Sequence, residues 1–181
     1  MSKTILQMLS IYEKVGIAVR EKLNDVPSQY NPQNIMQDYQ SIIVLARVPK
    51  DVAKENVIGK YHYAIGTIAA QDAVIKYLIH HGYKYDIIGS RAKNISLPRL
   101  GERAGVGELS PFRTLAVKGW GLRTVLSAII TDAPLIQTTQ AIGACTDKSK
   151  CLKTCPALGK DGVFDRTKCT SCGACVKKCP N

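Results

Sequence analysis

The chain has 181 residues, of which 45% are apolar and 22% charged, so it can form one globular domain, alone or with a small appendage. This composition excludes intrinsic disorder, and the absence of an apolar run of roughly 18 residues excludes a membrane-spanning helix. The formal net charge of +11 is compatible with nucleic acid, but the aromatic residues do not alternate with basic ones as in a stacking platform, so we do not expect nucleic-acid binding.

Residues 3–24 place apolar side chains at helical spacing and predict an amphipathic helix. After a polar stretch, residues 41–46 form an apolar run that predicts a buried strand. A second helix is predicted over residues 63–80, with Ile68, Val74 and Leu78 among its inward side chains and Gly82 as its stop. Residues 83–88 predict another short strand.

The following segment predicts a short helix that begins after Ser96, has Pro98 in its first turn and ends at Gly105. Two strands, 113–117 and 122–130, flank a glycine-containing hairpin or wide turn centred on Trp120. The elements together predict a mixed α/β (α+β) domain over residues 1–138, followed by a small cysteine-rich domain over residues 139–181.

All seven cysteines lie in the last 37 residues, from Cys145 to Cys179. A secreted disulfide framework would spread an even number of cysteines through the fold. No signal-peptide pattern precedes this odd, clustered set, because Glu13 and Glu21 interrupt the apolar residues near the N-terminus. We therefore expect a cytoplasmic protein whose cysteines bind metal.

The last four cysteines follow the pattern Cys-x2-Cys-x2-Cys-x3-Cys-Pro of bacterial ferredoxins, at Cys169, Cys172, Cys175 and Cys179. Three cysteines at this spacing surround three corners of one cubane, and the fourth starts a helical turn that faces away and binds the other cluster. Zinc sites use separated pairs of cysteines and suit this pattern poorly. The run predicts iron–sulfur clusters.

An earlier run places Cys145, Cys151 and Cys155 at the first, third and fourth positions of the same template, with Lys148 at the second. In this template the fourth cysteine of each run binds the cluster of the other run. One cluster is then a complete [4Fe-4S] cluster, whose ligands are Cys155, Cys169, Cys172 and Cys175. The second cluster keeps Cys145, Cys151 and Cys179.

Lysine is not a usual iron ligand, so the second site has four alternatives. It holds a [3Fe-4S] cluster, a [4Fe-4S] cluster with one iron open to water or substrate, or a [4Fe-4S] cluster that Asp147 completes. Alternatively, the site has degenerated and holds no stable cluster.

Residues 104–107 read AGVG and residues 131–135 read TDAPL, and a double-cluster segment follows them. In this combination the chain resembles the reductive dehalogenase and epoxyqueuosine reductase superfamily. The resemblance implies a nitroreductase-like scaffold that holds a corrinoid (cobalamin), with Ala104, Gly105 and Gly107 near this cofactor and the clusters feeding it electrons. The acidic proton donor of the queuosine enzymes has no equivalent beside Ser96.

These features predict an iron–sulfur oxidoreductase-type protein that passes electrons through its clusters, similar to corrinoid-dependent reductases. It is an enzyme only if a corrinoid or substrate is bound. The alternative is a stand-alone ferredoxin-like electron-transfer protein without corrinoid or substrate chemistry. In either case we expect a redox partner protein, such as a ferredoxin, a flavodoxin or a reductase, and a homo-oligomer is compatible with the sequence.

Overall fold

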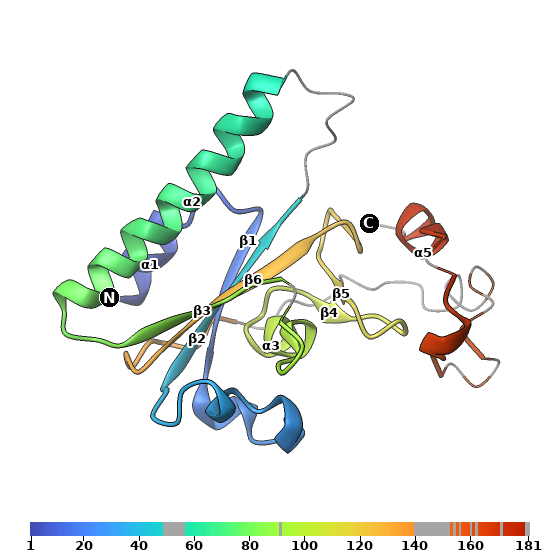
Figure 1. The fold of residues 1–181 in the computed structure, drawn as a ribbon, viewed down its shortest axis with the longest axis horizontal. Coiled ribbons are helices and arrows are strands. Elements are labelled where there is room, and N and C mark those ends of the chain that lie inside the picture. The colour runs from blue at the N-terminus through green and yellow to red at the C-terminus, as the bar shows by residue number, and fades with distance from the viewer. Residues whose placement is uncertain are drawn as a thin grey trace.

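The computed structural model describes residues 1–48, 57–90 and 92–139, and in the cysteine-rich segment residues 153, 155, 157–159, 161, 163–170 and 172–179. A four-stranded sheet carries α1 and α2 on one side and α3 on the other, and the cysteine-rich segment lies beyond β4 and β5 (Figure 1). The helices and strands are α1 (Ser2–Met8), β1 (Lys14–Val19), β2 (Ser41–Arg47), α2 (Val57–His80), β3 (Tyr85–Ile88), α3 (Leu97–Arg103), β4 (Glu108–Leu109), β5 (Leu115–Ala116), β6 (Val125–Thr131) and α5 (Ala174–Lys178). Short 3-10 turns occupy Arg20–Leu23, Ser28–Tyr30, Pro32–Asn34 and Arg166–Lys168.

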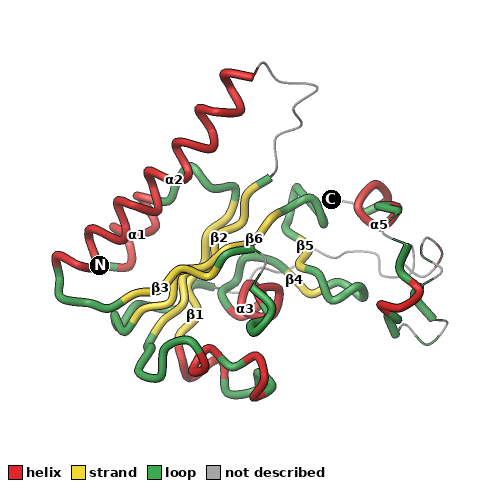
Figure 2. Tube along the Cα trace, in the orientation of Figure 1, coloured by secondary structure: helices red, strands yellow, loops and turns green. Residues whose placement is uncertain are grey.

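The sheet has the strand order β1-β2-β6-β3, and every neighbouring pair is antiparallel. Strand β2 is central and buried along its first six residues, because both faces of the sheet are covered (Figure 2). Side chains alternate between the two faces. One core packs against α1 and α2 and includes Ile17, Ile43, Ile129, Val74 and Leu78. The other packs against α3 and includes Ala18, Ile42, Val44, Ile130 and Leu100.

The predicted helix over residues 3–24 is wrong. Helix α1 ends at Met8, and Lys14–Val19 forms the edge strand β1, which pairs along its whole length with β2. The apolar residues of this segment fit a helix by spacing, but pairing with β2 buries Ile17 and Ala18 on opposite faces of the sheet. Long-range pairing therefore outweighs the local periodicity.

The second predicted helix and the two strands beside it are confirmed, although α2 begins earlier, at Val57. Gly82 has a left-handed φ of 77° just past the end of α2, where glycine commonly stops a helix. Val74 and Leu78 are fully buried, as predicted. Ile68 is 65% exposed, so its predicted inward position is wrong.

Helix α3 is also confirmed, with Pro98 in its first turn and Gly105 at a φ of 72° after its last residue. The two strands predicted after it do not pair with each other as a hairpin. Instead, β5 pairs with β4, and β6 enters the large sheet. Val117 and Gly121 exchange backbone hydrogen bonds of 2.9 and 2.8 Å, which close the turn around Trp120. The strands before and after this turn belong to different sheets.

Residues 136–139 run along the free edge of β1 as a strap that leads toward the cysteine-rich segment. Gln137 accepts a hydrogen bond from the Val19 amide at 2.9 Å and donates one to the Arg103 carbonyl at 2.6 Å. Thr138 accepts from the Ile17 amide at 2.9 Å and donates to the carbonyl of Ala104. The strap satisfies an open sheet edge and joins it to the end of α3. In the described parts of the chain, no helix combines the length and apolarity needed to cross a membrane.

Candidate metal centre

The first part of the cysteine-rich segment is a small hairpin that carries Cys155 at its start. Leu158 and Phe164 form an antiparallel bridge, and the Gly159 amide donates to the Val163 carbonyl at 2.9 Å. Leu158 is nearly buried, and its amide donates to the carbonyl of Cys155 at 3.1 Å. The hairpin therefore folds Cys155 back toward the residues that precede Cys169.

A turn built on Asp165 leads into Cys169. The Asp165 carboxylate accepts hydrogen bonds from the amide and the hydroxyl of Thr167, at 3.0 and 2.6 Å. These two bonds, of which the one from the hydroxyl has the larger effect, lower the pKa of Asp165 below its ordinary value. The nearby Lys168 ammonium adds to this effect. The ionised carboxylate thus fixes the backbone directly before the first cysteine of the run.

Cys172 and Cys175 flank the N-terminus of α5. Gly173 adopts a left-handed conformation, with φ 71° and ψ 5°, which lets the chain turn from Cys172 into the helix. The pKa of the Cys172 thiol is lowered by the amide of Ala174 and next by the hydroxyl of Thr170. These donors favour the thiolate, the form that binds metal.

Cys175 is influenced electrostatically by a cysteine from each of the two runs. Burial raises the pKa of its thiol, and the charges of Cys155 and Cys169 raise it further. A nearby like charge disfavours the thiolate, so one cysteine of each run contributes to the raised pKa of Cys175. None of the five described cysteines forms a disulfide.

Cys179 is the C-cap of α5, with an extended backbone of φ −61° and ψ 116°. The expectation that this cysteine starts a helical turn is therefore wrong, because it ends one. Residues before a proline avoid helical backbone angles, which explains this conformation. Cys145, Cys151, Asp147 and Lys148 lie outside the described residues.

The donor set fits an iron–sulfur cluster better than a single metal ion. Among the described residues, no group of three His, Cys, Asp or Glu side chains is gathered tightly enough to hold one ion. Ligands of a cubane bind different iron atoms and need not converge on one point. Thiolates are soft ligands, and at this spacing, with backbone amides beside them, they suit iron and sulfide.

The loop singled out for a corrinoid, residues 104–107, is buried in this fold. A Cβ atom at Gly16 of β1 would lie 2.0 Å from the carbonyl oxygen of Ala104, and one at Gly107 would lie 2.2 Å from that of Ala116. The glycines therefore let two backbone segments approach each other closely. In this structure, residues 104–107 pack against neighbouring backbone in the protein interior.

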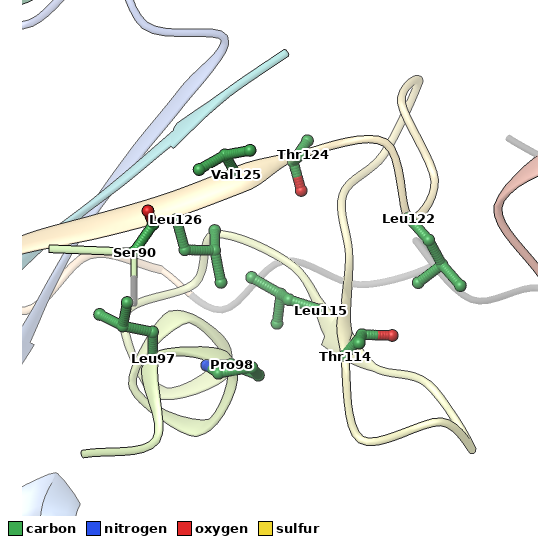
Figure 3. A pocket seen from close by; sticks show the side chains of 9 residues that line it. All are labelled: Ser90, Leu97, Pro98, Thr114, Leu115, Leu122, Thr124, Val125 and Leu126. Carbon is green, nitrogen blue, oxygen red and sulfur yellow. The ribbon is translucent and has the colours of Figure 1, made fainter. Parts of the chain in front are cut away.

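A pocket of about 350 Å³ lies beside this loop, between α3, β5 and the start of β6 (Figure 3). Six apolar and three hydroxyl side chains line it: Leu97, Pro98, Leu115, Leu122, Val125, Leu126, Ser90, Thr114 and Thr124. The sequence gives no signal for this pocket, because its walls come from segments that are far apart along the chain. Two residues before Thr114, the ring of Phe112 contacts that of Phe164 in the cysteine hairpin.

Residues 163–181 match the family described as 4Fe-4S binding domain. No curated protein matches the chain in sequence.

Solved structures of similar fold include epoxyqueuosine reductases and reductive dehalogenases. Epoxyqueuosine reductase from Streptococcus thermophilus is 17% identical, with a TM-score of 0.72 over 94% of this chain and 57% of that chain. The enzyme from Bacillus subtilis is 18% identical, with a TM-score of 0.68 over 92% of this chain and 55% of that one. A catabolic reductive dehalogenase in complex with 3-bromo-4-hydroxybenzoic acid is 18% identical, with a TM-score of 0.55 over 81% of this chain and 23% of that chain.

The chain thus spans little more than half the length of the epoxyqueuosine reductases that it resembles. The similarity includes the mixed α/β domain with its antiparallel sheet, and the family match adds the cysteine run. The protein therefore has the fold shared by epoxyqueuosine reductases and reductive dehalogenases, and it carries a 4Fe-4S binding domain over residues 163–181.

Proposed function

We propose that this protein is an iron–sulfur oxidoreductase that passes electrons through [4Fe-4S]-type clusters to an acceptor at its α/β domain. The observation that carries the proposal is the match of residues 163–181, which include Cys169, Cys172, Cys175 and Cys179, to a 4Fe-4S binding domain. The charges of Cys155 and Cys169 both raise the pKa of Cys175, which supports a site that draws on both cysteine runs. A bound cluster supplies one-electron transfer at this position.

The proposed ligands of the first cluster are Cys155, Cys169, Cys172 and Cys175. Two observations support this set. The amide of Ala174 and the hydroxyl of Thr170 lower the pKa of Cys172 and so favour its thiolate. The hydrogen bonds of Asp165 fix the backbone turn before Cys169. The proposed ligands of the second cluster are Cys145, Cys151 and Cys179, with Lys148 at the missing position. Its type is [3Fe-4S], or [4Fe-4S] with Asp147 or water as the fourth ligand.

A corrinoid is the acceptor that the family resemblance implies, but the described residues do not fit one at the loop. Ala104, Gly105 and Gly107 are buried by neighbouring backbone. The adjacent pocket, at about 350 Å³, lies near the lower end of the range of small-molecule sites, roughly 300–1,000 Å³. A corrin macrocycle carries amide groups around its rim, and the side chains of the described residues that line this pocket offer three hydroxyls.

The buried loop favours a second candidate function, that of an electron-transfer protein without corrinoid or substrate chemistry. In this case the α/β domain docks a redox partner, such as a ferredoxin, a flavodoxin or a reductase. Incubating the reconstituted protein with cobalamin distinguishes the two functions. A corrinoid absorbance that stays with the chain through gel filtration supports the corrinoid-dependent reductase, and its absence supports the electron-transfer protein.

Serine variants test the ligand assignment after anaerobic reconstitution with iron and sulfide. We expect Cys155→Ser and Cys172→Ser to remove the same EPR signal of the reduced protein. Cys179→Ser should remove a different signal, because its proposed cluster is the other one. If Cys155→Ser and Cys179→Ser affect the same signal, the exchange of ligands between the two runs is wrong.

A further inference from the structure

Helix α2 is apolar on two sides, although the fold covers only one of them. Val74 and Leu78 are fully buried against the sheet, within the core shared with α1. On another side, Ile68 is 65% exposed and Ile79 is 55% exposed. The fold therefore leaves two large apolar side chains of α2 in contact with solvent.

The exposed isoleucines lie on one side of α2, with the exposed Asp72 between Ile68 and Ile75. Ile68 and Ile79 are eleven residues apart, which is about three helical turns, so they point in nearly the same direction. Ile75 lies between them on this side and is half-buried. We call Ile68, Ile75 and Ile79 the α2 stripe. Exposed apolar side chains that share one side of a helix can form part of an interaction surface.

The charges beside the stripe indicate which partner fits it. Asp72 and Lys76 form an ion pair of 2.7 Å, and both side chains are more than half exposed. If two copies of α2 pack antiparallel around a two-fold axis, Ile68 of each copy faces Ile79 of the other. In the same register, Asp72 of each copy lies close to Lys76 of the other. The surface is therefore complementary to itself, as a two-fold interface requires.

We propose that the α2 stripe is the interface of a homodimer, in which two copies of this chain pack through antiparallel α2 helices. Each chain carries a formal net charge of +11, so the two copies repel each other at long range. The attraction must then come from the apolar stripe and the short-range ion pairs. Added salt screens the repulsion, so a dimer of this kind persists or strengthens at moderate ionic strength.

Sedimentation velocity of the reconstituted full chain tests this interface. We expect a dimer for the natural sequence and a monomer for the double variant Ile68→Glu with Ile79→Glu. The matched control is Ile136→Glu, because Ile136 is 74% exposed and lies outside α2, so this variant should remain dimeric. Circular dichroism and iron content of both variants should match those of the natural protein, which separates loss of the dimer from loss of the fold.

Charge variants test the register of the interface. Asp72→Lys alone places only positive charge beside the stripe, and Lys76→Asp alone places only negative charge there. Each should weaken its own dimer by at least tenfold, whereas a mixture of the two variants should form a heterodimer. A natural protein that stays monomeric, or a double isoleucine variant that stays dimeric, would overturn the proposal. Either result leaves the iron–sulfur function untouched, because the iron content is measured separately.

Discussion

The rings of Phe112 and Phe164 meet edge to face, with their centroids 5.8 Å apart and their planes at 86°. Phe112 is nearly buried in the loop between β4 and β5, and Phe164 belongs to the hairpin that carries Cys155. This contact fixes the cysteine-rich segment against the same part of the α/β domain that lines the pocket. In the proposed electron path, the distance from a cluster in this segment to an acceptor in the pocket therefore depends on this pair.

Replacing Phe164 by alanine should loosen the cysteine-rich segment. An edge-to-face pair contributes about 0.5–1.5 kcal/mol beyond its buried area, and loss of the ring also leaves Phe112 with an open face. We expect Phe164→Ala to release iron to a chelator several times faster than the natural protein. Val163→Ala is the control, because Val163 is 56% exposed and should change the rate little. Equal rates for the two variants would mean that the ring contact does not hold the segment.

The approach of β1 to the end of α3 predicts a strong effect at Gly16. An added Cβ atom would lie 2.0 Å from the Ala104 carbonyl oxygen, and neither backbone can move without breaking sheet pairing or the α3 end. Overpacking a core typically costs about 1–3 kcal/mol, so Gly16→Ala should lower the free energy of unfolding by at least this amount. Urea denaturation measures the change.

Gly89→Ala is the matched control for this experiment. A Cβ atom at Gly89 would meet no other atom within 4 Å, and we expect the variant to unfold like the natural protein. If Gly16→Ala is as stable as Gly89→Ala, then β1 and α3 do not approach as closely as described.

The strap along β1 predicts a measurable contribution from Gln137. Its side chain accepts from the Val19 amide and donates to the Arg103 carbonyl, and truncation leaves both backbone groups without these partners. Unsatisfied groups in such partly buried positions cost about 1–3 kcal/mol. Gln137→Ala should therefore unfold at lower urea concentration, whereas the exposed Thr139→Ala should not. Identical midpoints would show that the strap adds nothing to stability.

Tyr12 predicts a loss of stability at high pH. Burial raises its pKa to about 12, from the ordinary value of 10, and its hydroxyl donates to the Thr67 carbonyl at 3.1 Å. Between pH 10 and 12 the unfolded chain releases this proton while the folded chain keeps it, so the free energy of unfolding falls across this window. At 1.36 kcal/mol per pH unit, the fall is at most about 3 kcal/mol.

Urea denaturation across this window, compared with pH 9, measures the effect. Tyr12→Phe should reduce the slope, and a smaller slope should remain because burial also raises the pKa of Tyr39. If Tyr12→Phe keeps the full slope of the natural protein, the Tyr12 hydroxyl is not buried as described.

The parts of the fold that depend on local sequence could be predicted. The run of residues 41–46 is apolar without interruption because β2 is covered on both faces, and Gly82 stops α2 because no side chain opposes its left-handed φ. Segments whose structure depends on distant residues could not. Residues 14–19 form a strand only because β2 pairs with them, and Ile68 is exposed although it shares the apolar spacing of its helix.

The same division applies to the candidate site. The cysteine spacing is a short-range pattern, so the metal-binding segment could be read directly from the sequence. The pocket could not, because Ser90, Leu97 and Leu122 meet only after the chain has folded. The glycines of residues 104–107 suggest a cofactor loop, and only the folded chain shows that Gly107 also makes room for the neighbouring Ala116 backbone.

Iron and acid-labile sulfide per chain, counted after anaerobic reconstitution, test the proposed electron path most directly. Two clusters, one complete and one at the Lys148 site, predict about seven or eight iron atoms per chain and a similar amount of sulfide. EPR of the oxidised protein separates these values, because a [3Fe-4S] cluster is paramagnetic when oxidised. About four iron atoms per chain would contradict the second cluster, and iron without sulfide would contradict both.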